Sequence, residues 1–170
     1  MGLGCRAVGG RRRSGVRLET DLTPIISIME AYDPANPESN ALAARLCDYD
    51  INPTPQRIEI TRILFEKPAH FAADEIYAKV NVDQPRVSRA TVYNTLGLFV
   101  ERGLLRQVII DPNKVFYDSN TDRHYHFYDT QTGELKDIDA SNIEITGLPE
   151  LPDGTELDGV EVIVRLRGSR

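Results

Sequence analysis

Apolar residues recur every three or four positions across residues 40–103, which is the spacing of amphipathic helices. Two of the predicted helices have a clear start signal, because Thr54 and Ser88 offer hydroxyl caps and Pro55 suits a first helical turn. Gly103 is suited to end the last of them. The sequence therefore predicts four helices, at residues 40–50, 54–66, 72–80 and 88–102.

From residue 105 the pattern changes to short alternating runs of apolar and polar residues, which predict strands. The predicted strands are 105–110, 115–117, 124–128, 134–138 and 157–167. The first two are joined by a turn at 111–114 and form a hairpin directly after the helices. Helices followed at once by a two-stranded hairpin are the order of a winged helix-turn-helix.

Composition divides the chain into a leader and two domains. Residues 1–36 are rich in Gly and Arg without a helical or strand period, which predicts a disordered leader or a start assigned too early, with Met29 as the second candidate start. Residues 37–119 would form a winged-helix domain, and residues 120–170 a small α/β domain for dimerisation and sensing. The predicted fold class is α+β. Because a single copy would leave open sheet edges, we expect a homodimer.

The net charge of −6 at first disfavours nucleic acid as a partner, but the charge is unevenly distributed. Residues 1–20 carry +4, residues 51–117 carry +2, and residues 118–170 carry −7. DNA binding needs cations placed at the contact surface rather than a basic total. The mildly basic middle of the chain therefore remains a candidate DNA-binding surface.

The predicted helix that begins at Ser88 would enter the major groove of DNA. Its first turns carry side chains that can reach base edges or phosphates, and a further Arg in the helix at 54–66 could contact a phosphate. The candidate DNA-binding residues are Arg57, Ser88, Arg89, Thr91, Tyr93 and Asn94. The alternative is an ordinary helix of a protein-interaction module, with these polar residues facing solvent.

The chain has three histidines, and His124 and His126 lie two positions apart on a predicted strand. Their imidazoles would point to the same face, about 7 Å apart. His70 precedes the third helix and Asp137 lies on the partner strand, so both could join one site. This set suits Zn, Fe(II) or Mn(II), and His124 and His126 could equally serve as axial ligands of haem. The alternative is a chance pair of histidines on an exposed strand.

Several classes of protein are disfavoured by the sequence. Cys5 and Cys47 are too few for a disulfide framework, and no apolar run approaches the roughly 18 residues of a membrane span. We therefore expect a cytoplasmic protein that does not bind membranes. The chain has no helical HExxH motif, Gly-rich phosphate loop or Ser nucleophile elbow, so we expect no enzymatic activity.

With these elements in place, the sequence resembles the ferric uptake regulator superfamily over residues 40–167. The matching segments are Thr54–Arg57, His70–Tyr77, Arg89–Leu96, Gly103–Arg106 and His124–His126. The haem-responsive iron response regulator branch is the most similar, through Leu104–Val108, His124–Tyr128 and Val162–Arg167. The resemblance implies a homodimeric transcription regulator on a palindromic operator, with a regulatory site at the hinge between its domains. The residues that fall on the ligand positions of that site are His70, His124, His126 and Asp137.

Some positions depart from the family pattern. Asp129 and Thr132 stand where the family has the CxxC pair of a structural zinc, so we expect no such zinc here. Tyr117 stands where many members have a Glu ligand of the regulatory site. Cys5 is not followed by the Pro of the branch's haem motif, which makes the histidine strand the better candidate for haem.

The main hypothesis is a regulator of iron and haem genes whose DNA binding is modulated by haem or a divalent metal at the hinge histidines. The first alternative is a repressor that senses Fe(II), Mn(II) or Zn(II) directly. The second belongs to another class, a dimeric adaptor that buffers metal without binding DNA.

Overall fold

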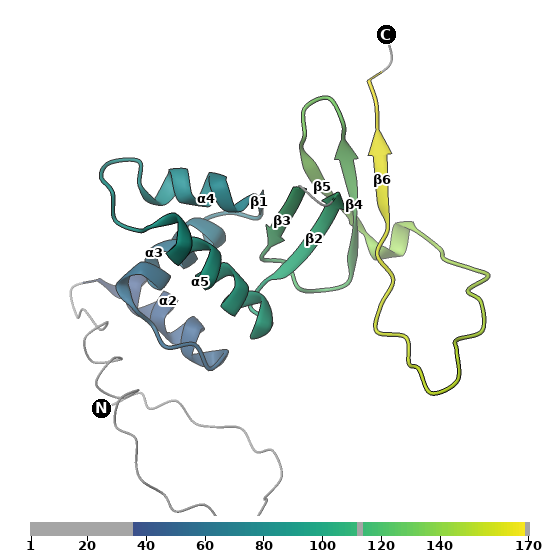
Figure 1. Ribbon diagram of the computed structural model, residues 1–170, viewed down its shortest axis with the longest axis horizontal. Helices are drawn as coiled ribbons and strands as arrows, with labels where there is room; N and C mark the ends of the chain where they lie inside the picture. The colour runs from purple at the N-terminus through teal and green to yellow at the C-terminus, as the bar shows by residue number, and fades with distance from the viewer. Residues whose placement is uncertain (1–35, 112–113, 169–170) are drawn as a thin grey trace, which may run out of the picture.

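The fold is taken from a computed structural model, which describes residues 36–111 and 114–168. The predicted leader up to residue 35, with Cys5 and Met29, and the middle of the predicted turn at 111–114 lie outside these residues. A group of helices is followed by two three-stranded sheets (Figure 1). The elements are α2 (Pro37–Asp48), α3 (Pro55–Phe65), β1 (His70–Phe71), α4 (Ala73–Val80), α5 (Arg89–Glu101), β2 (Arg106–Asp111), β3 (Lys114–Asp118), β4 (His124–Asp129), β5 (Leu135–Asp139), η1 (Ala140–Asn142) and β6 (Ile163–Leu166).

The predicted helix starts at Thr54 and Ser88 are confirmed. The Thr54 hydroxyl accepts a hydrogen bond from the Arg57 backbone N–H at 3.4 Å, and the Ser88 hydroxyl accepts one from Thr91 at 3.1 Å. The first helix begins earlier than predicted, at Pro37, because Asn36 caps it and the proline fits its first turn. Each cap satisfies one of the backbone N–H groups that a helix start leaves without a partner.

The helices enclose the main hydrophobic core. From α5 the side chains of Val92, Leu96 and Phe99 are fully buried, as their spacing of four and three predicted. They pack with residues of α3 and α4 such as Ile60 and Ile76. Burial of one such side chain stabilises the fold by about 1.5–3 kcal/mol. This packing fixes which face of α5 remains outside, where its polar residues lie.

The first sheet has the strand order β1-β3-β2. The wing hairpin predicted after the helices is confirmed as β2 and β3, with Val108 opposite Phe116. The sheet also contains β1, a two-residue strand that the sequence did not predict because two residues show no alternation. It pairs with β3 so that His70 lies opposite Asp118.

The second sheet has the strand order β5-β4-β6. The predicted hairpin is confirmed as β4 and β5, with His126 opposite Asp137. The last strand, β6, runs parallel to β4 and covers four residues, so the predicted start at residue 157 was wrong. The ladder with β4 begins where His126 meets Ile163, and the alternating residues before it lie outside that ladder.

A second hydrophobic core joins the two sheets. Val108, Ile110 and Phe116 of the wing pack with Tyr128 and Leu135 of the second sheet. Polar contacts flank this core: Lys114 Nζ donates to Tyr128 Oη at 2.9 Å, and Arg165 donates to the Ile110 carbonyl at 2.6 Å. The predicted boundary near Asn120 falls between β3 and β4, yet side chains from both sides of it share this core. None of the described helices has the length and apolar composition needed to cross a bilayer.

Candidate metal centre

Five side chains from four strands converge at the junction of the two sheets. They are His70 of β1, Asp118 of β3, His124 and His126 of β4, and Asp137 of β5. One donor atom from each lies within 4.8 Å of all the others. The convergence follows from strand register, because β1 faces β3, β4 faces β5, and residues two apart on β4 share a face. The four residues predicted as metal ligands are therefore brought together.

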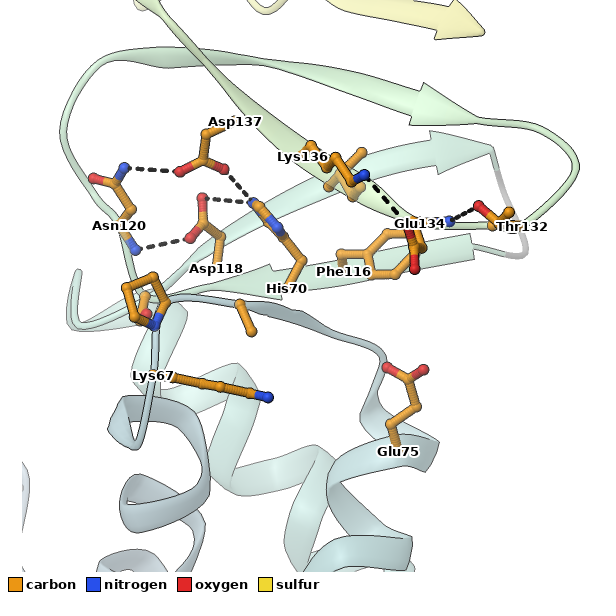
Figure 2. Close-up of a pocket in the computed structure, with 15 residues that line it drawn as sticks. Lys67, His70, Glu75, Phe116, Asp118, Asn120, Thr132, Glu134, Lys136 and Asp137 are labelled. Atoms are coloured by element: carbon orange, nitrogen blue, oxygen red, sulfur yellow. Dashed lines mark hydrogen bonds and ion pairs between the residues drawn. The ribbon is translucent and has the colours of Figure 1, made fainter. Parts of the chain in front are cut away.

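The distances between donor atoms are short enough for all five to face a single ion. His124 Nε2 lies 2.9 Å from His126 Nε2 and 2.9 Å from Asp118 Oδ2. His70 Nε2 lies 2.9 Å from Asp137 Oδ1 and 3.6 Å from Asp118 Oδ2 (Figure 2). Asp118, His124 and His126 are buried, whereas the Asp137 side chain is 41% exposed. Most of the cluster is therefore buried, and the Asp137 carboxylate lies at its solvent-exposed edge.

Two buried atoms of the cluster lack a hydrogen-bond partner of acceptable geometry, His70 Nε2 and Asp118 Oδ2. Leaving a buried polar atom unsatisfied costs about 1–3 kcal/mol, and coordination of a cation would satisfy both atoms. Three imidazole nitrogens and two carboxylate oxygens suit Zn, Fe(II) or Mn(II), whereas Ca and Mg prefer oxygen ligands alone. The residues present fit a divalent transition metal.

Neighbouring residues orient the donors. The Nδ1–H of His124 donates to the Asp122 carbonyl at 2.8 Å, which leaves the lone pair of a neutral ring on Nε2, toward the centre. Asn120 holds both carboxylates: its backbone N–H donates to Asp118 Oδ1 at 2.8 Å, and its side-chain amide donates to Asp137 Oδ2 at 3.3 Å (Figure 2). Contacts of this kind orient the donors toward the centre and reduce the cost of assembling the site.

Asp118 is ionised at the centre of the cluster. Burial by itself would raise the pKa of its carboxyl, but the neighbouring imidazoles of His126 and His70 and the backbone N–H of Asn120 hold that pKa well below its ordinary range. A buried carboxylate beside three imidazoles gives the centre a fixed negative charge. That charge favours a cation over a neutral ligand.

The sequence pattern does not identify Asp118 as a candidate ligand, and the family resemblance marks its neighbour Tyr117 as the altered position of the site. Tyr117 belongs instead to the helical core, since successive residues of a strand point to opposite faces. Phe116 and Asp118 share the other face. Asp118 lies beside His70 because β1, which contains His70, pairs with β3. The alternation along β3 was a usable signal, but β1 could not be seen in the sequence.

A cleft of about 760 Å³ opens beside the cluster (Figure 2). Its walls come from the segment before α4 on one side and from the β4–β5 turn on the other, and include Lys67, His70, Glu134 and Asp137. The cleft gives solvent a route to the Asp137 carboxylate and to His70. Loading of the centre would not require the fold to open.

The candidate DNA-binding residues occupy the first turns of α5, except for Arg57 on α3. Ser88 is engaged as the helix cap, and its hydroxyl also lies 2.8 Å from that of Thr91. Asn94 is exposed and Tyr93 is 46% exposed. Arg57 donates to the Asn52 carbonyl at 2.8 Å. The polar face that sequence spacing predicted for α5 is therefore present on the outside of the helical core.

Curated relatives match part of the chain in sequence. Over 95 residues it is 37% identical to a peroxide-responsive repressor PerR of Staphylococcus aureus strain Mu50, which is 56% of this chain and 64% of the relative. Over 85 residues it is 38% identical to the PerR of strain USA300, which is 50% of this chain and 57% of the relative. The chain thus spans less than two thirds of these relatives. They do not support the finer assignment to the haem-responsive branch.

Solved structures share the fold. The ferric uptake regulator of Pseudomonas aeruginosa, solved with manganese, has a TM-score of 0.57 at 21% sequence identity. The matched region covers 75% of this chain and 97% of the Pseudomonas chain. The ferric uptake regulator of Vibrio cholerae has a TM-score of 0.57 at 18% sequence identity, and the matched region covers 74% of this chain and 98% of the Vibrio chain. The predicted α+β fold, a winged-helix part followed by a small sheet domain, is confirmed. The pattern that describes the Ferric uptake regulator family matches residues 49–156, more than half of the chain, and the protein belongs to this family.

Proposed function

We propose that the chain is a divalent-metal-responsive repressor that binds operator DNA as a homodimer. The observation that carries the proposal is the convergence of three imidazoles and two carboxylates within 4.8 Å at the junction of the two sheets. Membership in this family, and the repressors among the relatives, agree with the expectation of a regulator rather than an enzyme.

The centre joins the two parts of the molecule because its donors come from both sheets. His70 and Asp118 belong to the sheet that carries the wing, while His124, His126 and Asp137 belong to the second sheet. A bound cation supplies positive charge and directional bonds to these donors. The five side chains would then link the two sheets beside the hydrophobic core that they share, and α4, which contacts β3, would be held with them.

In this proposal α5 reads the major groove through the first turns that follow Ser88. Arg89 and Asn94 have the hydrogen-bonding groups for purine edges, whereas Thr91 and Tyr93 reach phosphates or a thymine methyl. Arg57 serves as a phosphate contact. In a homodimer the two copies of α5 would read the halves of a palindrome.

Dimerisation through the second sheet is part of the proposal. Both β5 and β6 are edge strands of that sheet, with backbone groups available for a partner. Sedimentation equilibrium would give the mass of a dimer. A monomer at micromolar concentration would contradict this part of the proposal.

A peroxide response is a second candidate, favoured by the relatives that carry this description. A redox-active Fe(II) at the centre would make the site sensitive to peroxide, while Mn(II) would not. We expect hydrogen peroxide to release the Fe(II)-loaded protein from DNA and to leave the Mn(II)-loaded protein bound. Equal release of both forms would remove this candidate.

The haem hypothesis is less favoured by the geometry. The Nε2 atoms of His124 and His126 lie 2.9 Å apart and both rings are buried, so a haem plane could reach them only if the rings separated. A titration with haemin, followed through its Soret band, tests this directly. A band that shifts stoichiometrically and is lost in the His124→Ala/His126→Ala variant would restore haem as the ligand.

The test of the main proposal measures metal and DNA binding in the same variants. Calorimetric titration with MnCl₂ and ZnCl₂ should show one site per chain, weakened strongly in His124→Ala/His126→Ala and in Asp137→Asn. Asp153→Asn, at an exposed acid that belongs neither to the cluster nor to the cleft, is the matched control. Selection of bound duplexes from a randomised library, with metal and with EDTA, should give metal-dependent enrichment that both site variants lose. Unchanged metal binding in both site variants would refute the site.

A further inference from the structure

Two of the side chains proposed to read bases share one carboxylate on the neighbouring helix. Arg89 Nη1 donates to Asp74 Oδ1, and Tyr93 Oη donates to the same oxygen at 3.2 Å. Asp74 lies in the first turn of α4, which runs beside α5 (Figure 1). The two side chains are therefore held in relation to each other as well as to α4.

The ring of Tyr77 completes the support. The guanidinium carbon of Arg89 lies 4.7 Å from the centre of that ring, so the side chain is held by a charge on one side and an aromatic face on another. A guanidinium carries five N–H donors, and the contact with Asp74 leaves most of them available. The side chains of Arg89 and Asp74 are 57% and 63% exposed, so a duplex can reach them.

We propose that Asp74 is a specificity-determining residue that positions Arg89 and Tyr93 for base recognition without contacting a base itself. The inference rests on the proposed function, since it assumes that α5 reads DNA. A guanidinium fixed in one orientation discriminates between base edges, whereas a free one also binds phosphates of any sequence. The charge of Asp74 repels those phosphates, so the residue lowers non-specific affinity while it raises discrimination.

The size of the effect follows from the exposure of the pair. Exposed ion pairs contribute about 0.2–1 kcal/mol, which corresponds to about a 1.4- to 5-fold change in the equilibrium between the oriented and the free Arg89 side chain. We expect Asp74→Asn to reduce the ratio of specific to non-specific affinity by at most that factor, about 1.4- to 5-fold. Non-specific affinity itself should rise, most clearly at low salt.

Asp83→Asn is the matched control. Asp83 is an exposed acid in the connection between α4 and α5, and its substitution removes the same charge from the same region while leaving the contacts of Arg89 and Tyr93 in place. Both variants should raise non-specific affinity, but only Asp74→Asn should reduce discrimination. In an Arg89→Ala/Tyr93→Phe background, where both contacts of Asp74 are already absent, Asp74→Asn should have no further effect on discrimination.

The probe is a duplex library with randomised central positions, bound by the full chain with excess MnCl₂, and the enriched sequences are compared among variants. Loss of preference at the position read by Arg89, in Asp74→Asn and not in Asp83→Asn, is the expected result. An identical motif and identical discrimination in Asp74→Asn and the unsubstituted protein would overturn the inference and leave the proposed function standing. If the unsubstituted protein enriches no motif, the proposed function fails and the inference fails with it.

Discussion

Replacement of Asp118 by Asn tests whether Asp118 is a fifth ligand, in addition to the four that the sequence predicts. The substitution keeps the size of the side chain but removes the buried negative charge and one of the five donors. Tyr117→Phe is the matched control, because it removes one oxygen from the adjacent residue, whose side chain lies in the helical core. We expect metal binding to weaken in the first variant and to stay unchanged in the second.

The expected magnitude can be worked out from the role of the carboxylate. Loss of a residue that only orients a ligand costs about 10- to 100-fold in metal affinity, so loss of a ligand should cost at least as much. With metal at about 100 times the dissociation constant, binding stabilises the protein by about 2.7 kcal/mol. After a 100-fold loss of affinity, the same concentration gives only about 0.4 kcal/mol.

Thermal unfolding with and without MnCl₂, at one protein concentration, measures this difference. For a chain of this size about 1 kcal/mol corresponds to about 2–4 °C, so the metal should raise the Tm of the unsubstituted protein by about 5–11 °C and that of Asp118→Asn by about 1–2 °C. The metal-free Tm of each variant serves as its own reference. A full metal-induced shift in Asp118→Asn, or its loss in Tyr117→Phe, would refute the assignment of Asp118 as a ligand.

Three further predictions concern stability and orientation. Removal of the helix cap by Ser88→Ala should cost about 0.5–2 kcal/mol in urea unfolding, and an unchanged midpoint would mean that the cap is dispensable. Asn120→Ala should weaken metal binding about 10- to 100-fold in calorimetry, because Asp137 loses the side-chain amide that orients it while the backbone N–H to Asp118 remains; an equal affinity would show that Asp137 needs no such support. The lowered pKa of Asp118 means that its ionised form stabilises the fold above the unfolded-state pKa of about 4, and that this contribution disappears as the pH falls toward the folded-state value. The urea midpoint of the metal-free protein should therefore decline between pH 5 and pH 3 less steeply in Asp118→Asn, and parallel curves would contradict the ionised state of this group.

The parts of the fold that the sequence predicts are those governed by local physics. Ser88 and Thr54 predict helix starts because a side-chain hydroxyl can accept a hydrogen bond from a backbone N–H a few residues later in the chain. His124 and His126 share a face because any strand alternates, and Asp137 is found because a short turn fixes the register of its hairpin. None of these inferences needs a contact between distant segments.

The parts that the sequence did not predict depend on such contacts. Strand β1 exists only because β3 lies beside it, and Asp118 becomes a candidate ligand only through that pairing. Alternation at residues 157–162 indicates a strand, but a strand needs a neighbour, and the ladder with β4 starts later. The pairing of Arg89 with Asp74 likewise joins two helices that the sequence shows only separately.

The shared core of the wing and the second sheet changes where the chain can be cut. A fragment that ends at residue 119 would retain every candidate DNA-binding residue, yet it would expose Val108, Ile110 and Phe116, which are buried against the second sheet. Such an apolar patch promotes aggregation. A chimaera that joins this fragment to another dimerisation domain will therefore need one of two changes. Either the new domain must offer a sheet surface that covers these three side chains, or the wing must carry polar residues in their place.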